Sequence, residues 1–226
     1  MDDLVGDVVL KLGEKPEVLA NTYIFFTSDN GFHHGEHRIP QGKGRPYEES
    51  VRVPLVIRGP KVVPPAAGQP RLSTDKLVLN TDYFPTFMEL AGAQAQTPSY
   101  VDGRSLVPVL TPSATTSWRT AILIEGRKFS EDPEIPVDVN YNTIRTSTDE
   151  YTDKYTEYEG GFRELYDLSP LADPYELTNT YYSADPTVSP RPERKARLDA
   201  LRTCQPQNDP TTPEVEIPCQ AAEDAP

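Results

Sequence analysis

The sequence has no apolar run that approaches the roughly 18 residues a membrane-spanning helix needs, so a transmembrane segment is excluded. Its first residues also lack a basic segment followed by an apolar stretch, and we expect no signal peptide within the sequence given. Basic residues are scarce: 22 Lys and Arg stand against 35 Asp and Glu, a formal net charge of -13. Because no basic stripe is present to bind phosphates, we predict no nucleic-acid partner.

Apolar residues are also few, at 36% of the chain with 9% aromatics, which is low for a compact domain. Proline is abundant, with 24 residues, about twice the usual frequency. A chain of 226 residues can form one large domain or two small ones and bury a core. The composition therefore predicts a folded protein with much loop.

Only two cysteines are present, Cys204 and Cys219, and they lie in a polar, proline-rich stretch near the C-terminus. This spacing is not a zinc pattern. A disulfide is the simplest interpretation: it would close a loop of about 15 residues and contribute about 3 kcal/mol in an oxidising compartment. Two free, exposed thiols are the alternative.

The first half of the chain predicts an α/β domain over residues 1–112. Apolar residues recur at helical spacing over residues 2–15, which indicates an amphipathic helix. The nearly continuous apolar run at 22–28 is typical of a strand buried on both faces of a mainly parallel sheet. A second short strand is predicted at 54–58, and a helix at 81–91.

The second half predicts a small antiparallel α+β subdomain over residues 113–205, reached through a linker rich in Pro, Ser and Thr at 98–116. Strand-like content occurs in four segments: 120–125, 142–148, 151–158 and 163–168. A charged surface helix is predicted at 191–203. The tail, 206–226, is expected to be disordered unless the disulfide pins it.

The polar residues that promise chemistry follow the first strand. Asp29 and Asn30 offer a carboxylate and an amide oxygen, which are hard ligands suited to calcium or magnesium. They lie where a strand ends, the edge at which open α/β sheets bind ligands. A simple Asx turn is the alternative, because Asp-Asn-Gly is also a common turn tripeptide.

Lys43 lies between two glycines, so its ammonium can return toward Asp29 and Asn30 and bind an anionic oxygen. A solvated lysine is the alternative. The same loop contains three histidines: His33, His34 and His37. They are candidate metal ligands, proton donors or hydrogen-bond donors to a substrate, and the alternative for each is a packed or exposed histidine.

The string TSDNGFHHGEHR, followed by GKGRPYEESVRVPLVIRGP, is similar to the sulfatase family of the alkaline phosphatase superfamily, in the branch of glucosamine 6-sulfatases and fungal or bacterial arylsulfatases. Two further blocks, DYFPTFMELAGA and RELYDLSPLADPYELTN, resemble the following helix and the C-terminal signature of that family. The resemblance spans roughly residues 1–205, in the family's order. It implies an incomplete alkaline-phosphatase-like sheet followed by the small antiparallel subdomain.

The resemblance also implies roles. Asp29 and Asn30 correspond to ligands of a divalent cation, usually calcium, with magnesium as the other option. Lys43 corresponds to the lysine that contacts the sulfate ester, and His33 and His37 lie in a loop near the substrate. The implied reaction is hydrolysis of sulfate esters of sugars or aryl alcohols, with a sulfated small molecule or glycan as partner and a secreted parent protein.

One feature of the family is absent. Sulfatases form their formylglycine nucleophile from the Cys or Ser of a C-x-P-x-R motif, and this sequence has none; Cys204 begins C-Q-P but no arginine follows. The early Asp-Asp metal ligands are also not found. We therefore expect this C-terminal half to be poorly soluble and inactive alone, with a missing N-terminal half as its partner. Two alternatives stay open: a non-catalytic binding or complementing module, and a fragment of a related phosphoester hydrolase.

Overall fold

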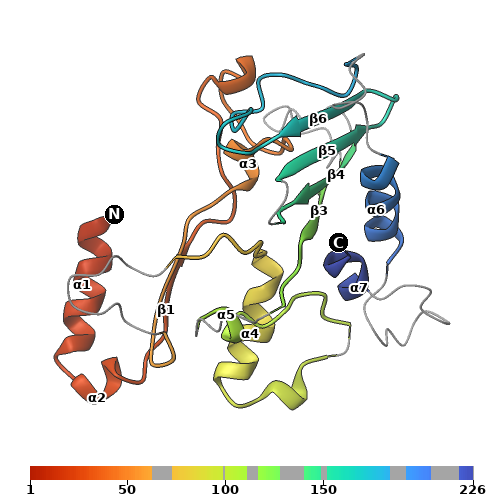
Figure 1. Ribbon diagram of the computed structural model, residues 1–226. Coiled ribbons are helices and arrows are strands. Elements are labelled where there is room, and N and C mark those ends of the chain that lie inside the picture. The colour runs from red at the N-terminus through yellow and green to blue at the C-terminus, as the bar shows by residue number, and fades with distance from the viewer. Residues whose placement is uncertain are drawn as a thin grey trace.

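The structure is a computed structural model that describes residues 1–62, 73–98, 100–110, 117–127, 140–148, 152–183, 192–204 and 219–225. Figure 1 shows a four-stranded sheet with two C-terminal helices on one side, and a two-stranded ribbon that leads away to a pair of N-terminal helices. Helices and sheets are mixed along the chain, which confirms the α/β class. No helix in the described ranges is both long and apolar enough to cross a bilayer.

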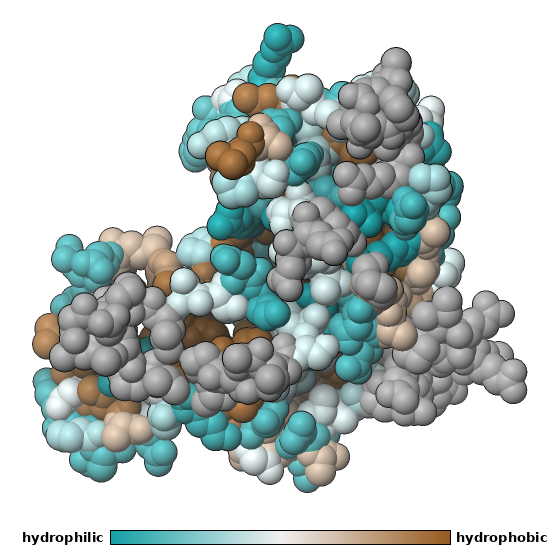
Figure 2. Space-filling view, in the orientation of Figure 1, coloured by the Kyte–Doolittle hydropathy of each residue, from teal (hydrophilic) through white to brown (hydrophobic). Residues whose placement is uncertain are grey.

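The N-terminal helices are α1 (Asp2–Gly13) and α2 (Pro16–Leu19). The helical spacing predicted α1, and its acidic first turn suits the positive end of the helix dipole. None of its residues is buried, and Leu4 and Leu10 are 68% and 73% exposed. Figure 2 shows brown, apolar atoms in the lobe where Figure 1 places this helix. On the apolar face of α1, Leu4 and Val8 are exposed and Val5, Val9 and Leu12 are half-buried, so this face is only partly covered.

The first strand, β1 (Ile24–Thr27), pairs antiparallel with β2 (Leu55–Arg58) in a two-stranded sheet. The chain between them contains η1 (Glu36–Arg38) and α3 (Glu48–Val51). The apolar run was typical of a strand in a mainly parallel sheet, whereas this pair is antiparallel and β1 is half-buried rather than covered on both faces. The reason is that an apolar run shows that a strand needs cover, but not which strand will pair with it.

The predicted helix at 81–91 is confirmed as α4 (Tyr83–Leu90), which follows η2 (Asn80–Asp82) and precedes η3 (Gln94–Gln96). The predicted linker at 98–116 was wrong for 100–110, which contains α5 (Val107–Leu110). Leu106 there is fully buried, and its N–H donates to the Thr86 hydroxyl at 2.8 Å. Residues 111–116, which include the predicted domain boundary, lie outside the described residues.

The C-terminal sheet confirms all four predicted strands. Its members are β3 (Ala121–Gly126), β4 (Tyr141–Thr146), β5 (Asp153–Tyr158) and β6 (Arg163–Asp167), paired antiparallel in chain order. The last turn uses Gly160 and Gly161 at φ +93° and +91°, a conformation that glycine adopts without steric cost. One apolar core joins this sheet to the C-terminal helices; its buried members are Ala121, Ile144, Tyr155, Leu165, Leu198, Leu201 and Ala222.

Two helices cover the sheet, α6 (Pro192–Thr203) and α7 (Cys219–Asp224). The prediction of a surface helix was wrong for one face of α6, where Arg197, Leu198 and Leu201 are buried. The Arg197 guanidinium donates to the Glu223 carbonyl at 2.8 Å. A charged composition thus concealed an inner face, because an arginine can bury its stem when its head is paired.

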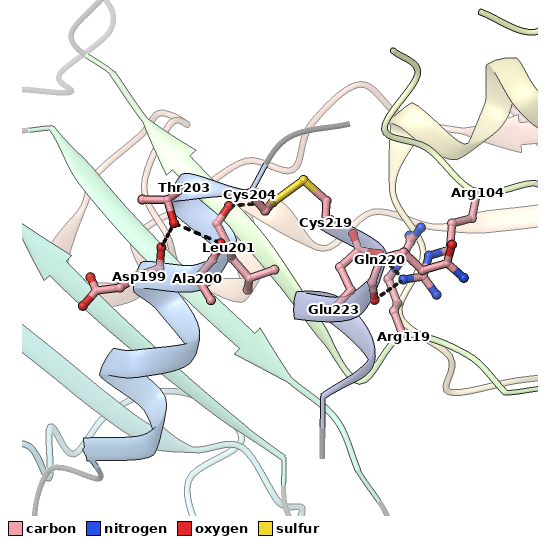
Figure 3. Close-up of a disulfide and its surroundings, with 10 residues drawn as sticks. All are labelled: Arg104, Arg119, Asp199, Ala200, Leu201, Thr203, Cys204, Cys219, Gln220 and Glu223. Atoms are coloured by element: carbon pink, nitrogen blue, oxygen red, sulfur yellow. Dashed lines mark hydrogen bonds and ion pairs between the residues drawn. A yellow bond between two sulfur atoms is a disulfide. The ribbon is translucent and has the colours of Figure 1, made fainter. Parts of the chain in front are cut away.

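The disulfide between Cys204 and Cys219 is formed and joins α6 to α7 (Figure 3). The tail was expected to be disordered unless this bond pinned it. Residues 219–225 are ordered as α7 and its end, with Ala222 and Glu223 buried, while residues 205–218 lie outside the described residues. The disulfide therefore holds the last helix against the sheet.

A buried ionic network also fixes α7. The Arg119 guanidinium is fully buried and contacts both Asp82 carboxylate oxygens, at 2.7 and 2.9 Å, and Glu223 at 3.1 Å. Arg104 contacts Glu223 at 2.6 Å and Asp224 at 2.7 Å. Burial opposes the charge of Arg119, but hydrogen bonds and charge from Asp82 and Glu223 outweigh it and raise the pKa of the guanidinium. This network links η2 and the chain just before β3 to α7.

Replacing Cys204 and Cys219 by serine should lower the free energy of unfolding by about 3 kcal/mol, because the open loop regains entropy in the unfolded chain. Urea denaturation with and without a reductant measures this loss. The wild type should weaken on reduction and the serine variant should not respond. Equal midpoints for oxidised and reduced wild type would contradict the prediction.

Replacing Asp82 by alanine should destabilise the fold by about 3–5 kcal/mol, because within the described residues it leaves the buried charge of Arg119 with Glu223 as its remaining ion-pair partner. Asp75 is exposed and serves as the control: alanine there should change stability by less than about 0.5 kcal/mol. Denaturant titration of both variants gives the comparison. A similar small loss for both would mean that the network contributes little.

Candidate functional site

The site begins where β1 ends. The Ser28 hydroxyl donates to the Asn30 carbonyl at 2.8 Å, and the Asn30 N–H donates to Asp29 Oδ1 at 2.9 Å. The Asn30 amide donates to the Gly31 carbonyl at 2.8 Å, which leaves Oδ1 of the same side chain to accept hydrogen bonds. This tight turn carries one carboxylate and one amide oxygen on consecutive residues, Asp29 and Asn30.

Gly31 makes the turn possible. Its N–H donates to the Ser50 carbonyl at 2.9 Å, so the end of β1 packs directly against α3. A Cβ at this position would lie 2.0 Å from the Glu49 carbonyl oxygen, far inside contact distance. Only glycine fits, and the close approach fixes Asp29 and Asn30 relative to α3.

Lys43 returns to this turn as the sequence predicted. Its ammonium donates to Asn30 Oδ1 at 3.0 Å. The flanking glycines have φ of +142° and +81°, and the His33 N–H donates to the Gly42 carbonyl at 2.8 Å, which closes the loop. The Gly44 N–H donates to the Ser50 hydroxyl at 2.9 Å. Backbone geometry, rather than chance, therefore brings the lysine to the turn.

The oxygens of this turn fit a hard divalent cation in type and exposure. Asp29 is exposed and Asn30 is half-buried, so a cation can reach both. An amide oxygen has two lone pairs, so Asn30 can accept from Lys43 and still bind a cation. Calcium takes about 6–8 oxygen ligands, and these two residues would supply part of that shell.

The three histidines have different surroundings. His34 is exposed, and its ring is 5.1 Å from that of Phe32. His37 stacks on Tyr47 at 3.8 Å and places Nε2 3.2 Å from a carboxylate oxygen of Glu49. Neither His33 nor His37 hydrogen-bonds Asp29, Asn30 or Lys43 within the described residues. The roles predicted for them stay predictions.

His33 is fully buried, and within the described residues neither ring nitrogen has a hydrogen-bond partner. Burial lowers the pKa of this imidazole, and His37 and Arg45 act in the same direction, against the charges of Glu49 and Glu36. The ring is thus held neutral in the folded state over a wider pH range than an exposed histidine.

Residues that the sequence patterns did not predict support the segment between β1 and β2, residues 28–54, which we call the site loop. The Lys154 ammonium is fully buried on β5 and contacts the Pro46 carbonyl at 2.7 Å, Glu48 at 3.1 Å and Glu176 at 2.7 Å. Burial alone would raise the pKa of Glu48, but Lys154 and Arg145 outweigh it and lower that pKa. Glu176 lies in the block RELYDLSPLADPYELTN and Glu48 in GKGRPYEESVRVPLVIRGP, but neither block indicated that these residues meet Lys154.

A second support comes from Glu164 on β6. This buried carboxylate accepts hydrogen bonds from three tyrosine hydroxyls, those of Tyr47 at 2.9 Å, Tyr158 at 2.7 Å and Tyr166 at 3.0 Å. Burial and the adjacent charge of Glu164 raise the pKa of Tyr47 to about 12 and raise those of the other two tyrosines. Tyr47, on which His37 stacks, is therefore anchored to the C-terminal sheet.

The arrangement suits an anion. The Lys43 ammonium offers hydrogen-bond donors and positive charge, and Asp29 and Asn30 can hold a cation beside it. The Lys43 ammonium and a bound cation, on one side of a tetrahedral anion, would neutralise the oxygens of that anion and stabilise charge on a departing oxygen.

Known proteins resemble most of the chain. Residues 35–202 match the family described as N-sulphoglucosamine sulphohydrolase, C-terminal. N-acetylglucosamine-6-sulfatase from Bos taurus is 32% identical over 90% of this chain and 38% of its own length, and sulfatase ppz1 from Metarhizium majus is 36% identical over 89% and 40%. A solved structure, described under metabolism of multiple glycosaminoglycans by Bacteroides thetaiotaomicron, aligns with a TM-score of 0.62 and 25% identity over 88% of this chain and 38% of that one. The chain thus spans 38–40% of the length of these relatives.

The buried His33 should make stability depend on pH. Because folding lowers its pKa below the ordinary 6.5, the unfolded chain binds more protons there, so its contribution is complete above about pH 6.5 and is lost as the pH falls below it. The free energy of unfolding then changes by at most about 1.4 kcal/mol per pH unit for this one group. Urea denaturation at about pH 7.5 and about pH 5.5 should show a smaller loss in His33→Gln than in wild type.

His34→Gln is the matched control, since that neighbouring ring is exposed. Its pH dependence should equal that of wild type. If His33→Gln keeps the full pH dependence of the free energy of unfolding, that dependence arises from groups other than His33.

Proposed function

The chain belongs to the sulfatase family, and on that basis we propose that it forms the cation- and sulfate-binding side of a sulfuric ester hydrolase. The observation that carries the proposal is the contact between the Lys43 ammonium and the Asn30 amide oxygen, at 3.0 Å, with Asp29 next to Asn30 in the chain. The amide and the ammonium converge from two ends of one loop. Their convergence has a chemical use in a sulfatase and no evident use in packing, because the contact is exposed.

Each residue has a distinct task in this proposal. Asp29 and Asn30 hold calcium, or magnesium, through hard oxygens. Lys43 binds a sulfate oxygen and, because Asn30 holds it from one side, its ammonium is already oriented before the ester arrives. A bound divalent cation would supply Lewis-acid stabilisation of the sulfate oxygens. His33 and His37 stay proposed as residues near the substrate, on the inner side of the same loop.

The proposed substrates are sulfate esters of sugars or aryl alcohols, with sugars favoured because one relative is named as an N-acetylglucosamine-6-sulfatase. The net charge of -13 disfavours broad docking on an anionic polysaccharide. A single sulfated residue at Lys43 is compatible with that charge, since the attraction there is local. The disulfide suits an oxidising compartment, so we propose an extracellular or secretory location for the parent protein.

We expect no turnover of an aryl sulfate by these 226 residues alone, because they contain no C-x-P-x-R motif. Exposed apolar side chains on α1, those of Leu4, Val8 and Leu10, support further sulfatase sequence as the missing partner. A non-catalytic complementing module is the second candidate. A monodisperse, cooperatively unfolding chain would favour that module, and aggregation would favour the incomplete hydrolase.

Lys43→Gln should weaken binding of N-acetylglucosamine 6-sulfate in the presence of calcium by about 10- to 100-fold, the value of one charge-assisted hydrogen bond. Lys76→Gln is the matched control, because Lys76 is exposed and far along the chain, and it should bind as wild type does. Titration calorimetry with and without calcium measures both. Asp29→Asn should weaken the dependence on calcium.

Two results would contradict the proposal. One is sulfate-ester binding that neither calcium nor Lys43 affects. The other is hydrolysis of an aryl sulfate by the purified chain at a rate above that of Lys43→Ala, which would show that these residues carry a nucleophile of their own.

A further inference from the structure

A second group of metal-binding side chains lies on the inner side of the same loop. His37 comes from η1, Glu49 from α3 and Glu176 from the loop after β6, and one ligand atom from each lies within 4.8 Å of the others. The set differs in chemistry from Asp29 and Asn30, because it includes an imidazole nitrogen. It is separate from the oxygen ligands Asp29 and Asn30, although His37 is also one of the residues proposed above to lie near the substrate.

The charges of this cluster are incompletely balanced. The Glu176 side chain is 1% exposed, that of His37 is 9% exposed and that of Glu49 is 24% exposed. Lys154 contacts Glu176 and Glu48, and Arg145 also contacts Glu48, so these two cations balance Glu48 and Glu176 but not Glu49. Within the described residues the ion-pair partner of Glu49 is His37, which carries a charge only when protonated. The carboxylates of Glu49 and Glu176 lie within 4.8 Å of each other, and they repel unless a proton or a cation lies between them.

A buried imidazole without a partner lies against the cluster. The His33 side chain is fully buried, its two ring nitrogens have no hydrogen-bond partner within the described residues, and its ring is 6.1 Å from that of His37. A buried polar group without a hydrogen-bond partner is costly, so such a group calls for a ligand or a partner.

We propose that His37, Glu49 and Glu176 bind a divalent transition metal of the zinc type, with the His33 imidazole beside it. Zinc accepts a mixed set of imidazole nitrogen and carboxylate oxygens, whereas calcium prefers oxygens alone. Glu176 already uses both oxygens in contacts, but each carboxylate oxygen has a second lone pair for a metal.

The site has a structural consequence. The metal would join η1, α3 and the loop after β6, three segments that lie far apart in the sequence. It would stabilise the folded chain, because the ligands come together only on folding. It would therefore clamp the loop that carries Lys43 to the C-terminal subdomain, and it does not depend on the proposed sulfatase chemistry.

The test is a titration of Zn²⁺ into the chelator-treated full chain by calorimetry, with the thermal unfolding midpoint as a second measurement. We expect binding at one site and a higher midpoint with zinc. Glu49→Gln and His37→Asn should each weaken the affinity by about tenfold or more. His34→Asn is the matched control, because this exposed histidine lies outside the cluster, and it should bind zinc as wild type does.

Absence of zinc binding by the folded wild-type chain would overturn the proposal. So would equal affinity in Glu49→Gln, His37→Asn and wild type, or a loss confined to His34→Asn, since zinc would then bind adventitiously at the surface. Glu49 is partly exposed, so its variant should fold even where His37→Asn does not. Asp29→Asn should keep zinc binding, which separates failure here from failure of the sulfate site.

Discussion

The fold around the site depends on one buried ammonium, that of Lys154. It has no access to water, and its three N–H groups face the Pro46 carbonyl, Glu48 and Glu176. A buried charge is tolerated only when it is fully paired, so these groups must meet whenever the chain folds. Because they lie on β5, in the site loop and in the loop after β6, one side chain fixes the C-terminal sheet and the site loop relative to each other.

The consequences extend from α3 to the functional groups. Glu48 is the first residue of α3, and Ser50 in the same helix accepts from the Gly31 N–H through its carbonyl and from the Gly44 N–H through its hydroxyl. These two glycines flank the turn of Asn30 and the position of Lys43. The contact between the Asn30 amide and the Lys43 ammonium thus follows from backbone geometry that the C-terminal sheet supports. Burial does not hold it in place, because Lys43 is exposed and Asn30 is half-buried.

Local signals in the sequence were enough to predict much of the fold and part of the site. The strands of the C-terminal sheet followed from β-branched and aromatic content between turn residues, and the return of Lys43 to Asn30 followed from its flanking glycines. Features that depend on distant partners were not predictable. Lys154 and Glu48 are 106 positions apart, and nothing near either residue indicates the pair. The antiparallel pairing of β1 and the buried face of α6 were missed for the same reason, because neither an apolar run nor a charged helix specifies its neighbour.

The most direct test of this account is hydrogen exchange in a Lys154→Met variant. If the ammonium holds the site loop to the sheet, the amides of Gly31 and Gly44, which donate to Ser50, should exchange much faster than in wild type. Amides in the ladder between β3 and β4 should keep their protection. Unchanged exchange at Gly31 and Gly44 would contradict the account, as would equal acceleration in the loop and the ladder, because the loop would then not depend specifically on Lys154.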